Sequence, residues 1–185
     1  MENYEKRRGI FKAFSENIRD VCGPFKEYVF RGDIELEMIK TNALSYSAKF
    51  INLTQRRSKK GWNWAAFIFT PLWFAYRKMY IECVIVYVAS VLLPWVFTIV
   101  SYGSMSGIVN FLWSLALSVF VGVIGDYYYM IRTGNECEFA GKLEGKRRSR
   151  YIKRVSGTSK VAPVIVAGIG LALELYIRIK IFGGF

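Results

Sequence analysis

The sequence predicts an all-α integral membrane protein with three transmembrane helices, an aromatic interfacial or re-entrant helical segment and an amphipathic helical N-terminal head. Two observations predict this class. Apolar residues make up 53% of the 185 residues while 22% are charged, so apolar blocks alternate with polar ends. The net charge is +12, and because basic runs lie beside apolar blocks, it favours an anionic membrane surface over nucleic acid as the partner.

The cysteine and histidine content narrows the chemistry that the chain can perform. Cys22, Cys83 and Cys137 lie far apart, form no CxxC pair, and are accompanied by no histidine. This pattern argues against a disulfide framework and against a zinc site, and it removes the commonest general base. We therefore expect no metal, no cofactor, no catalytic residue and no enzymatic activity. The first residues lack the apolar core of a signal peptide.

Residues 1–60 are expected to form a cytoplasmic head of two amphipathic helices. Apolar side chains at helical spacing in residues 1–22 predict a basic helix that lies either on anionic lipid or on the next helix. A second helix is predicted over about 33–55. Its heptad stripe consists of Leu36, Ile39, Ala43, Tyr46, Phe50 and Leu53. The stripe is either the buried face of a helix hairpin, which is favoured, or a coiled-coil dimer contact.

A basic collar precedes an uncharged aromatic stretch over residues 61–76; the collar consists of Arg56, Arg57, Lys59 and Lys60. As a helix, the stretch would measure about 24 Å, which is short of a hydrocarbon core of about 30 Å. Pro71 removes one helix hydrogen bond, and Trp and Tyr prefer the headgroup level. We therefore expect residues 61–80 to be interfacial or re-entrant, with a true first span as the alternative. Asn63 is expected to hydrogen-bond the loosened backbone near Pro71.

The stretch WNWAAFIFTPLWFAYRKMY resembles the signature of a bacterial membrane-protein family known as domain of unknown function 2628. The signature combines an aromatic-Asn-Trp-Ala-Ala-Phe run, a Pro-aromatic step and a closing Tyr-Arg-Lys-Met-Tyr. The membrane-interface motif comprises Trp62, Asn63, Trp64, Phe67, Pro71, Trp73, Tyr76, Arg77, Lys78 and Tyr80. Thr70 stands where members often have Gly, and the similarity extends over about 32–135. The resemblance implies several apolar helices and no particular activity.

Three apolar segments are predicted to span the bilayer, at about 81–101, 107–127 and 161–182. The second span is expected to end in an interfacial aromatic belt at Tyr127–Tyr129. Two spans carry small residues suited to close helix contact, namely Ser114, Ser118 and Gly122 in the second and Gly168 and Ala172 in the third. A basic cytoplasmic loop is predicted over 132–160. Its basic cluster consists of Lys146, Arg147, Arg148 and Arg150.

The distribution of Lys and Arg predicts the orientation. With three spans, 24 of these residues lie on the side of the amino terminus and 2 on the other; if the aromatic stretch also spanned, the split would be 15 against 11. The positive-inside rule prefers the first arrangement. We therefore expect a multi-pass inner-membrane protein with a cytoplasmic N-terminus and a C-terminus outside.

Three residues are candidates for intramembrane polar chemistry: Glu174, Arg178 and Asp126. Glu174 and Arg178 share one helix face, so they form either a self-neutralised structural pair or part of a transport path, and the structural pair is favoured. Asp126 is expected to pair with the basic loop near Arg132, to cap a helix, or to bind a cation. Structural pairing is again favoured.

These features favour a non-enzymatic scaffold or adaptor, whose basic cytoplasmic surface binds a partner or anionic lipid headgroups. The expected protein partner is a second copy of the chain or another membrane protein. The alternative is a small transporter or channel subunit that uses Glu174, Asp126 and the re-entrant aromatic segment, because broken helices at membrane depth often hold such sites. A membrane-damaging toxin is a weaker third hypothesis, based on the cationic amphipathic start.

Overall fold

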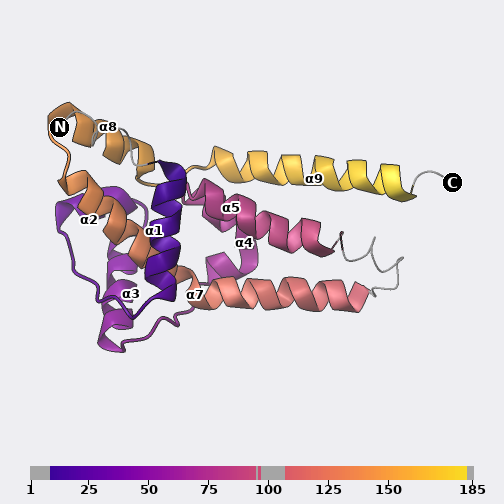
Figure 1. Cartoon of the computed structure of the whole chain (residues 1–185), viewed down its shortest axis with the longest axis horizontal. Helices are drawn as coiled ribbons and strands as arrows, with labels where there is room; N and C mark the ends of the chain where they lie inside the picture. Colours follow the sequence, from indigo (N-terminus) through magenta and orange to yellow (C-terminus); the bar gives the residue numbers. More distant parts are fainter. Residues whose placement is uncertain (1–8, 95, 97–106, 183–185) are drawn as a thin grey trace.

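The computed structural model describes residues 9–94, 96 and 107–182, and these residues form helices and no strands (Figure 1). The all-α prediction is therefore confirmed for this part of the chain. The elements are α1 (Ile10–Cys22), α2 (Asp33–Ile39), α3 (Ala43–Gln55), α4 (Trp64–Tyr76), α5 (Tyr80–Tyr87), the π-helix η1 (Val88–Leu92), α7 (Gly107–Gly141), α8 (Gly145–Val155) and α9 (Val161–Phe182).

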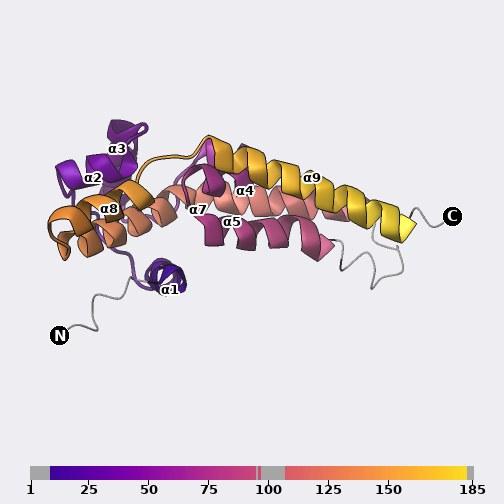
Figure 2. The same cartoon turned by 90° about the horizontal axis from the view of Figure 1, so that it is seen from above.

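The helices divide into two groups along the longest axis of the molecule. α5 with η1, the first half of α7, and α9 extend in the same direction; we call them the apolar helices (Figures 1 and 2). α1, α2, α3, α8 and the second half of α7 gather at the opposite end, which we call the head. α4 lies at the base of the apolar helices and contacts all three of them.

Among the described residues, α7 is the helix that is long and apolar enough to cross a membrane, judged by length and composition. Only 11% of its most apolar 18-residue window is buried, which is unlike the core helix of a water-soluble protein. The apolar parts of α5 with η1 and of α9 are shorter. Residues 95 and 97–101 of the predicted first span lie outside the described residues. The structure thus supports one candidate span and does not support three.

The helix predicted over residues 33–55 is in fact two helices. Lys40 and Asn42, between α2 and α3, have φ values of 54° and 61°, and such left-handed backbone interrupts a right-handed helix. The heptad stripe still points inward, because Ile39, Phe50 and Leu53 are buried in the core. These side chains pack within the chain, which agrees with the favoured intramolecular alternative.

The loop predicted over residues 132–160 is largely helical. α7 continues to Gly141, and α8 follows after a short connection. The tyrosines expected to form an interfacial belt are instead buried: Tyr127, Tyr128 and Tyr129 are 0%, 7% and 4% exposed. The reason is that α1, α2 and α3 pack around this part of α7 and enclose its aromatic side chains in the main core.

The small-residue face predicted on α9 is displaced by two residues. A Cβ atom added at Gly170 would lie 2.7 Å from the hydroxyl oxygen of Tyr87 on α5, whereas nothing lies within 4 Å of one added at Gly168. Gly170 therefore allows the close approach of α9 and α5, and the prediction for Gly168 and Ala172 is wrong.

Candidate functional site

The chain from Asn63 to Arg77 folds back on itself and forms an aromatic hairpin. Thr70 interrupts α4 with φ 22° and ψ −92°, because Pro71 disfavours helical backbone in the residue before it. Asn63 donates a hydrogen bond to the hydroxyl of Tyr46 over 3.4 Å, and the Arg77 guanidinium lies 4.4 Å from the ring centroid of the same tyrosine. A straight helix over this stretch would be about 21 Å long. The segment therefore returns to the side from which it starts.

The hairpin packs against the small residues that the sequence predicts on α7. The Thr70 and Ser118 hydroxyl oxygens are 3.0 Å apart at the tip of the hairpin. A Cβ atom added at Gly122 would lie 2.9 Å from the Cβ of Phe67. Ser118 precedes Asp126 by eight residues, so the tip reaches about 12 Å along α7 from the level of Asp126. This small-residue face receives the hairpin.

Asn63 connects the start of the hairpin to α7. Its side-chain oxygen accepts a hydrogen bond from the Ala66 amide over 3.0 Å and so caps α4, while its amide nitrogen donates to Asp126 Oδ1 over 2.7 Å. Its backbone amide donates to the Gly122 carbonyl over 2.8 Å. Asn63 is 2% exposed. The prediction that it bonds loosened backbone near Pro71 is wrong, since it caps the opposite end of that helical segment.

Asp126 is paired inside the head. Besides the bond from Asn63, its carboxylate accepts one from Lys49 of α3, with Nζ 2.9 Å from Oδ2. The Asp126 side chain is 3% exposed and that of Lys49 is 39% exposed. The residue is therefore in a structural pair, but the expected partner, the basic loop near Arg132, is wrong. Within residues 9–94, 96 and 107–182, no cluster of three His, Cys, Asp or Glu residues could hold a metal ion.

Arg77 closes the other end of the hairpin. It is 3% exposed, and its guanidinium lies over the rings of Tyr46 and Tyr129, at 4.4 and 5.0 Å from their centroids. Its Nη1 donates to the Thr41 carbonyl over 3.3 Å. A buried cation is costly unless hydrogen bonds and ring faces replace its water shell. We call Tyr46, Asn63, Arg77, Asp126 and Tyr129 the boundary network.

The junction between α4 and α5 is held by two further cations. Arg132 of α7 donates to the carbonyls of Arg77 and Lys78 over 3.1 and 3.2 Å. Lys78, with φ 57°, donates from Nζ to the Ser156 carbonyl over 2.7 Å. Burial lowers the pKa of Lys78, and the neighbouring charges of Lys40 and Arg132 lower it further. These bonds tie the junction to α7 and to the segment after α8.

The motif aromatics separate into buried and exposed groups. Trp73 is 3% exposed and packs on the core, while Tyr76 is partly buried. Trp62, Trp64 and Tyr80 are 38%, 64% and 51% exposed. The exposed rings thus lie where the head meets the apolar helices, because they flank the two ends of the hairpin.

The collar residues do not form one surface. Lys59 donates to the Val21 carbonyl over 2.8 Å and so closes the end of α1. Arg56, Arg57 and Lys60 are exposed. Arg57 pairs with Glu27 over 3.1 Å, so the charges of Arg56 and Lys60 are the most readily available to a membrane or a partner.

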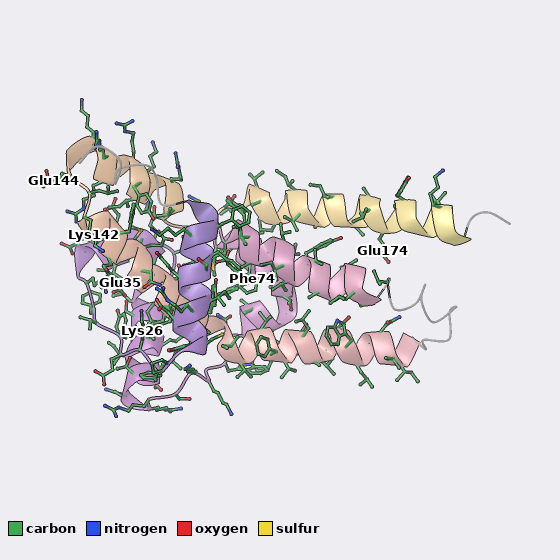
Figure 3. The ribbon with its side chains drawn as sticks, viewed as in Figure 1. Lys26, Glu35, Phe74, Lys142, Glu144 and Glu174 are labelled. Atoms are coloured by element: carbon green, nitrogen blue, oxygen red, sulfur yellow. The ribbon has the colours of Figure 1, made fainter. Side chains whose placement is uncertain are left out.

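The basic cluster of the predicted loop lies on the first two turns of α8, with Lys146, Arg147 and Arg150 exposed and Arg148 partly buried. α8 runs along the long axis, so its start is the end of the head that points away from the apolar helices (Figures 1 and 2). Figure 3 shows Lys142 and Glu144, which directly precede α8, at this distal end.

The structure does not bring Glu174 and Asp126 into one site. Glu174 lies on α9 among the apolar helices, where it interacts electrostatically with Tyr87 of α5 (Figure 3). The Arg178 side chain lies outside the described residues. Asp126 has its partners in the head and at the hairpin.

Sequence reasoning missed several members of this site, namely Tyr46, Lys49, Tyr129 and Arg132 in these roles. Tyr46 was visible only as one apolar position of the stripe, and Arg132 only as a presumed partner of Asp126. No local sequence pattern indicates these roles, because each residue contacts a partner that is distant in the chain.

Comparison with known proteins identifies a family. Residues 32–133 match the sequence profile of a family described as "Protein of unknown function (DUF2628)". The match covers just over half of the chain, from the start of α2 to the second half of α7, and it includes the whole boundary network. No curated protein and no solved structure matches significantly.

Proposed function

The chain belongs to the DUF2628 family, and we propose that it is a non-enzymatic membrane scaffold whose basic α8 end docks an acidic protein partner in the cytoplasm. One observation carries the proposal: the basic cluster of α8 and the exposed apolar helices lie at opposite ends of the molecule (Figure 1). In this arrangement the apolar end anchors the protein and the basic end faces the cytosol.

The proposed anchor has three membrane spans, which include the first half of α7, α9, and α5 with η1. Large apolar side chains point outward on all three; examples are Val84 on α5, Phe111 on α7 and Val164 on α9, which are 61%, 65% and 71% exposed. A water-soluble monomer rarely exposes apolar surface on this scale, whereas lipid accommodates it. The 22 residues of α9 give about 33 Å of helix, of which the apolar part, Val161–Tyr176, accounts for about 24 Å.

The aromatic hairpin enters the membrane from the cytoplasmic side and returns to it. Ile68 and Phe69 near its tip are 63% and 56% exposed, which suits contact with acyl chains. The 24 Lys and Arg residues of the head, the junction and residues 132–160 then lie in the cytoplasm, as the positive-inside rule favours. The N-terminus is cytoplasmic and the C-terminus is outside.

Distance favours a protein over the lipid surface as the ligand of the α8 cluster. Arg154, near the end of α8, lines a cavity together with Tyr80 and Ile81 at the start of α5. Lys146 precedes Arg154 by eight residues, or about 12 Å of helix directed away from the apolar helices. The Debye length in physiological salt is about 8 Å, so the membrane surface potential is strongly screened at Lys146.

A charge-reversal experiment tests the docking function. Full-length protein in nanodiscs would carry Lys146→Glu, Arg147→Glu, Arg148→Glu and Arg150→Glu together. The control carries Lys146→Arg, Arg147→Lys, Arg148→Lys and Arg150→Lys, which keeps every charge. We expect wild type and control to retain the same acidic protein, released by salt, from an extract that contains cytosolic and membrane proteins, and the reversed variant to lose it. Equal recovery by all three proteins would contradict the proposal.

No observation favours the transporter or channel alternative. Its proposed carriers, Glu174 and Asp126, have separate partners on separate elements. Asp126 is also joined to Asn63 and Lys49 in a pair that fixes the hairpin to the head.

A further inference from the structure

A cavity of about 570 Å³ lies between α1, α5, α7 and α8, beside the base of the apolar helices. Its volume is in the range of pockets that bind small molecules, roughly 300–1,000 Å³. It is distinct from the basic cluster of α8, because Lys146, Arg147, Arg148 and Arg150 do not line it. The cavity has a charged part and a larger apolar part, which together constrain its ligand.

Three cations and two carboxylates line the charged part. The cations are Lys78, Arg132 and Arg154, and the acids are Glu82 and Glu136. Both carboxylates accept phenol hydrogen bonds: Glu82 from Tyr128 over 2.8 Å, and Glu136 from Tyr151. These bonds occupy part of the acceptor capacity of the two acids. Three cations against two carboxylates give the lining an excess of one positive charge.

The cations keep hydrogen-bond donors for a ligand. The guanidinium of Arg132 uses two of its five N–H donors on the Arg77 and Lys78 carbonyls. The ammonium of Lys78 donates to the Ser156 carbonyl over 2.7 Å and to the Arg154 carbonyl over 3.5 Å, which leaves a third donor. Cations prearranged in this way suit a phosphate, whose oxygens accept several charge-assisted bonds at once.

The apolar part opens along the outer face of α5. Val84 and Ile85 line the cavity and are 61% and 46% exposed. The cavity is therefore open toward the outside of the apolar helices along this face of α5. Phe11 and Phe14 of α1 form the opposite wall. An acyl chain that enters from the bilayer would lie between these two walls.

We propose that this cavity binds one phospholipid with an anionic headgroup, with the phosphate at Lys78, Arg132 and Arg154 and an acyl chain along Val84 and Ile85. The proposal rests on the membrane placement of α5 and α7 proposed above. A headgroup without acyl chains would leave the apolar walls wet, and an uncharged amphiphile would leave the excess positive charge unmatched. Only a ligand with both parts matches the whole lining.

Native mass spectrometry of the delipidated full chain in detergent tests the proposal. The probes are phosphatidylglycerol, zwitterionic phosphatidylcholine and free glycerol phosphate. We expect one phosphatidylglycerol per chain at concentrations where the other two probes do not bind. Equal retention of phosphatidylcholine would overturn the requirement for negative charge, and equal binding of glycerol phosphate would overturn the requirement for an acyl chain.

Two variants at exposed positions locate the site without disturbing the core. Arg154→Glu reverses a lining cation, and Ile85→Trp fills the apolar part; each is expected to weaken phosphatidylglycerol binding about tenfold or more. The matched controls, Lys153→Glu and Ile165→Trp, change exposed residues that do not line the cavity and should leave binding unchanged. Wild-type binding by both test variants would overturn the proposal.

The α8 charge-reversed variant separates this inference from the docking function. It should bind phosphatidylglycerol as wild type does, because its four substitutions lie outside the cavity. If this variant loses the protein partner but still binds the lipid, both the docking function and the separate lipid site are supported. Loss of lipid from this variant would overturn the placement of the lipid in the cavity.

Discussion

Gly122 of α7 and Phe67 of the hairpin approach so closely that a Cβ atom added at Gly122 would lie 2.9 Å from the Cβ of Phe67. Atoms at this separation overlap, so only glycine permits the observed contact. The contact fixes the depth at which the hairpin lies along α7. It also shows that the small residues of α7 contact the hairpin, a segment that lies more than fifty positions earlier in the sequence.

The first prediction concerns this contact. Gly122→Ala should lower the free energy of unfolding by about 1–3 kcal/mol, because the hairpin must move to admit one methyl group. Gly134→Ala on the same helix is the matched control, since nothing lies within 4 Å of the added Cβ. The control should be neutral or more stable by up to about 1 kcal/mol, owing to the better helix propensity of alanine. Thermal unfolding in detergent measures both, and equal effects of the two substitutions would contradict the packing described.

The second prediction concerns Asn63. Asn63→Ala removes the cap of α4 and leaves a buried carboxylate oxygen of Asp126 without its donor. We expect a loss of about 2–4 kcal/mol, from the cap and the unsatisfied charged group together. Asn52→Ala, at an exposed position on α3, should change stability by less than about 0.5 kcal/mol. Chemical denaturation followed by tryptophan fluorescence would show the difference, and a near-neutral Asn63→Ala would be inconsistent with the boundary network.

The third prediction is a pH dependence at the contact between α1 and α7. Burial raises the pKa of Asp20, but hydrogen bonds from Lys26 and Asn135 and nearby positive charges lower it more, to below its ordinary value of 3.8. A carboxyl whose pKa is depressed by folding stabilises the native state above its unfolded pKa and loses this contribution as the pH falls through the folded pKa.

Wild type should therefore be more stable than Asp20→Asn at pH 7, and the difference should shrink as the pH falls below about 3.8. Unfolding midpoints measured from pH 7 down to pH 3 give the comparison. A stability difference that stays constant over this range would refute the assignment.

The fourth prediction concerns thiol reactivity. Burial raises the pKa of Cys137 to about 12, and the charges of Glu35 and Glu136 favour the neutral thiol further although Arg31 opposes them. The thiolate is the reactive form, so Cys137 should resist a maleimide at pH 7.5 while exposed Cys22 reacts within minutes. Peptide mapping by mass spectrometry distinguishes the two sites. Rapid labelling of Cys137 in the folded protein would show that the packing of α2 on α7 is wrong.

The fifth prediction concerns orientation. Ser149→Cys on the exposed start of α8, in a chain whose native cysteines are replaced, should react with an impermeant reagent only in inverted membrane vesicles. Thr70→Cys should react weakly from either side, because Thr70 is 5% exposed at the tip of the hairpin. Labelling of Ser149→Cys in intact cells would place α8 outside and would remove the proposed docking function.

The sequence predicted the elements whose signals are local. Periodic apolar residues revealed α1 and the inward stripe of α2 and α3, and the step from Thr70 to Pro71 marked the fold-back of the hairpin. It could not predict the break at Lys40 and Asn42, where no Pro or Gly interrupts the pattern. That break is explained by tertiary packing, which overrides helix propensity.

The errors in the second half of the chain share another cause. Residues 132–141 are polar, and a polar segment after an apolar span looks like a loop when only composition is considered. In the structure this segment remains helical because α1, α2 and α8 pack against it. For the same reason Tyr127–Tyr129 were mistaken for an interfacial belt, since their covering helices come from distant parts of the chain. The roles of Lys49 and Arg132 in the site could not be predicted for the same reason.

α7 passes without interruption from the apolar helices into the centre of the head. Its 35 residues form a rod about 50 Å long, and the two ends of a rigid rod must tilt together. In the membrane placement proposed above, a bilayer that thins or thickens would change the tilt of the embedded half of α7, and the head would tilt with it. The length of α7 would then couple the thickness of the bilayer to the angle at which the distal end of α8 is presented.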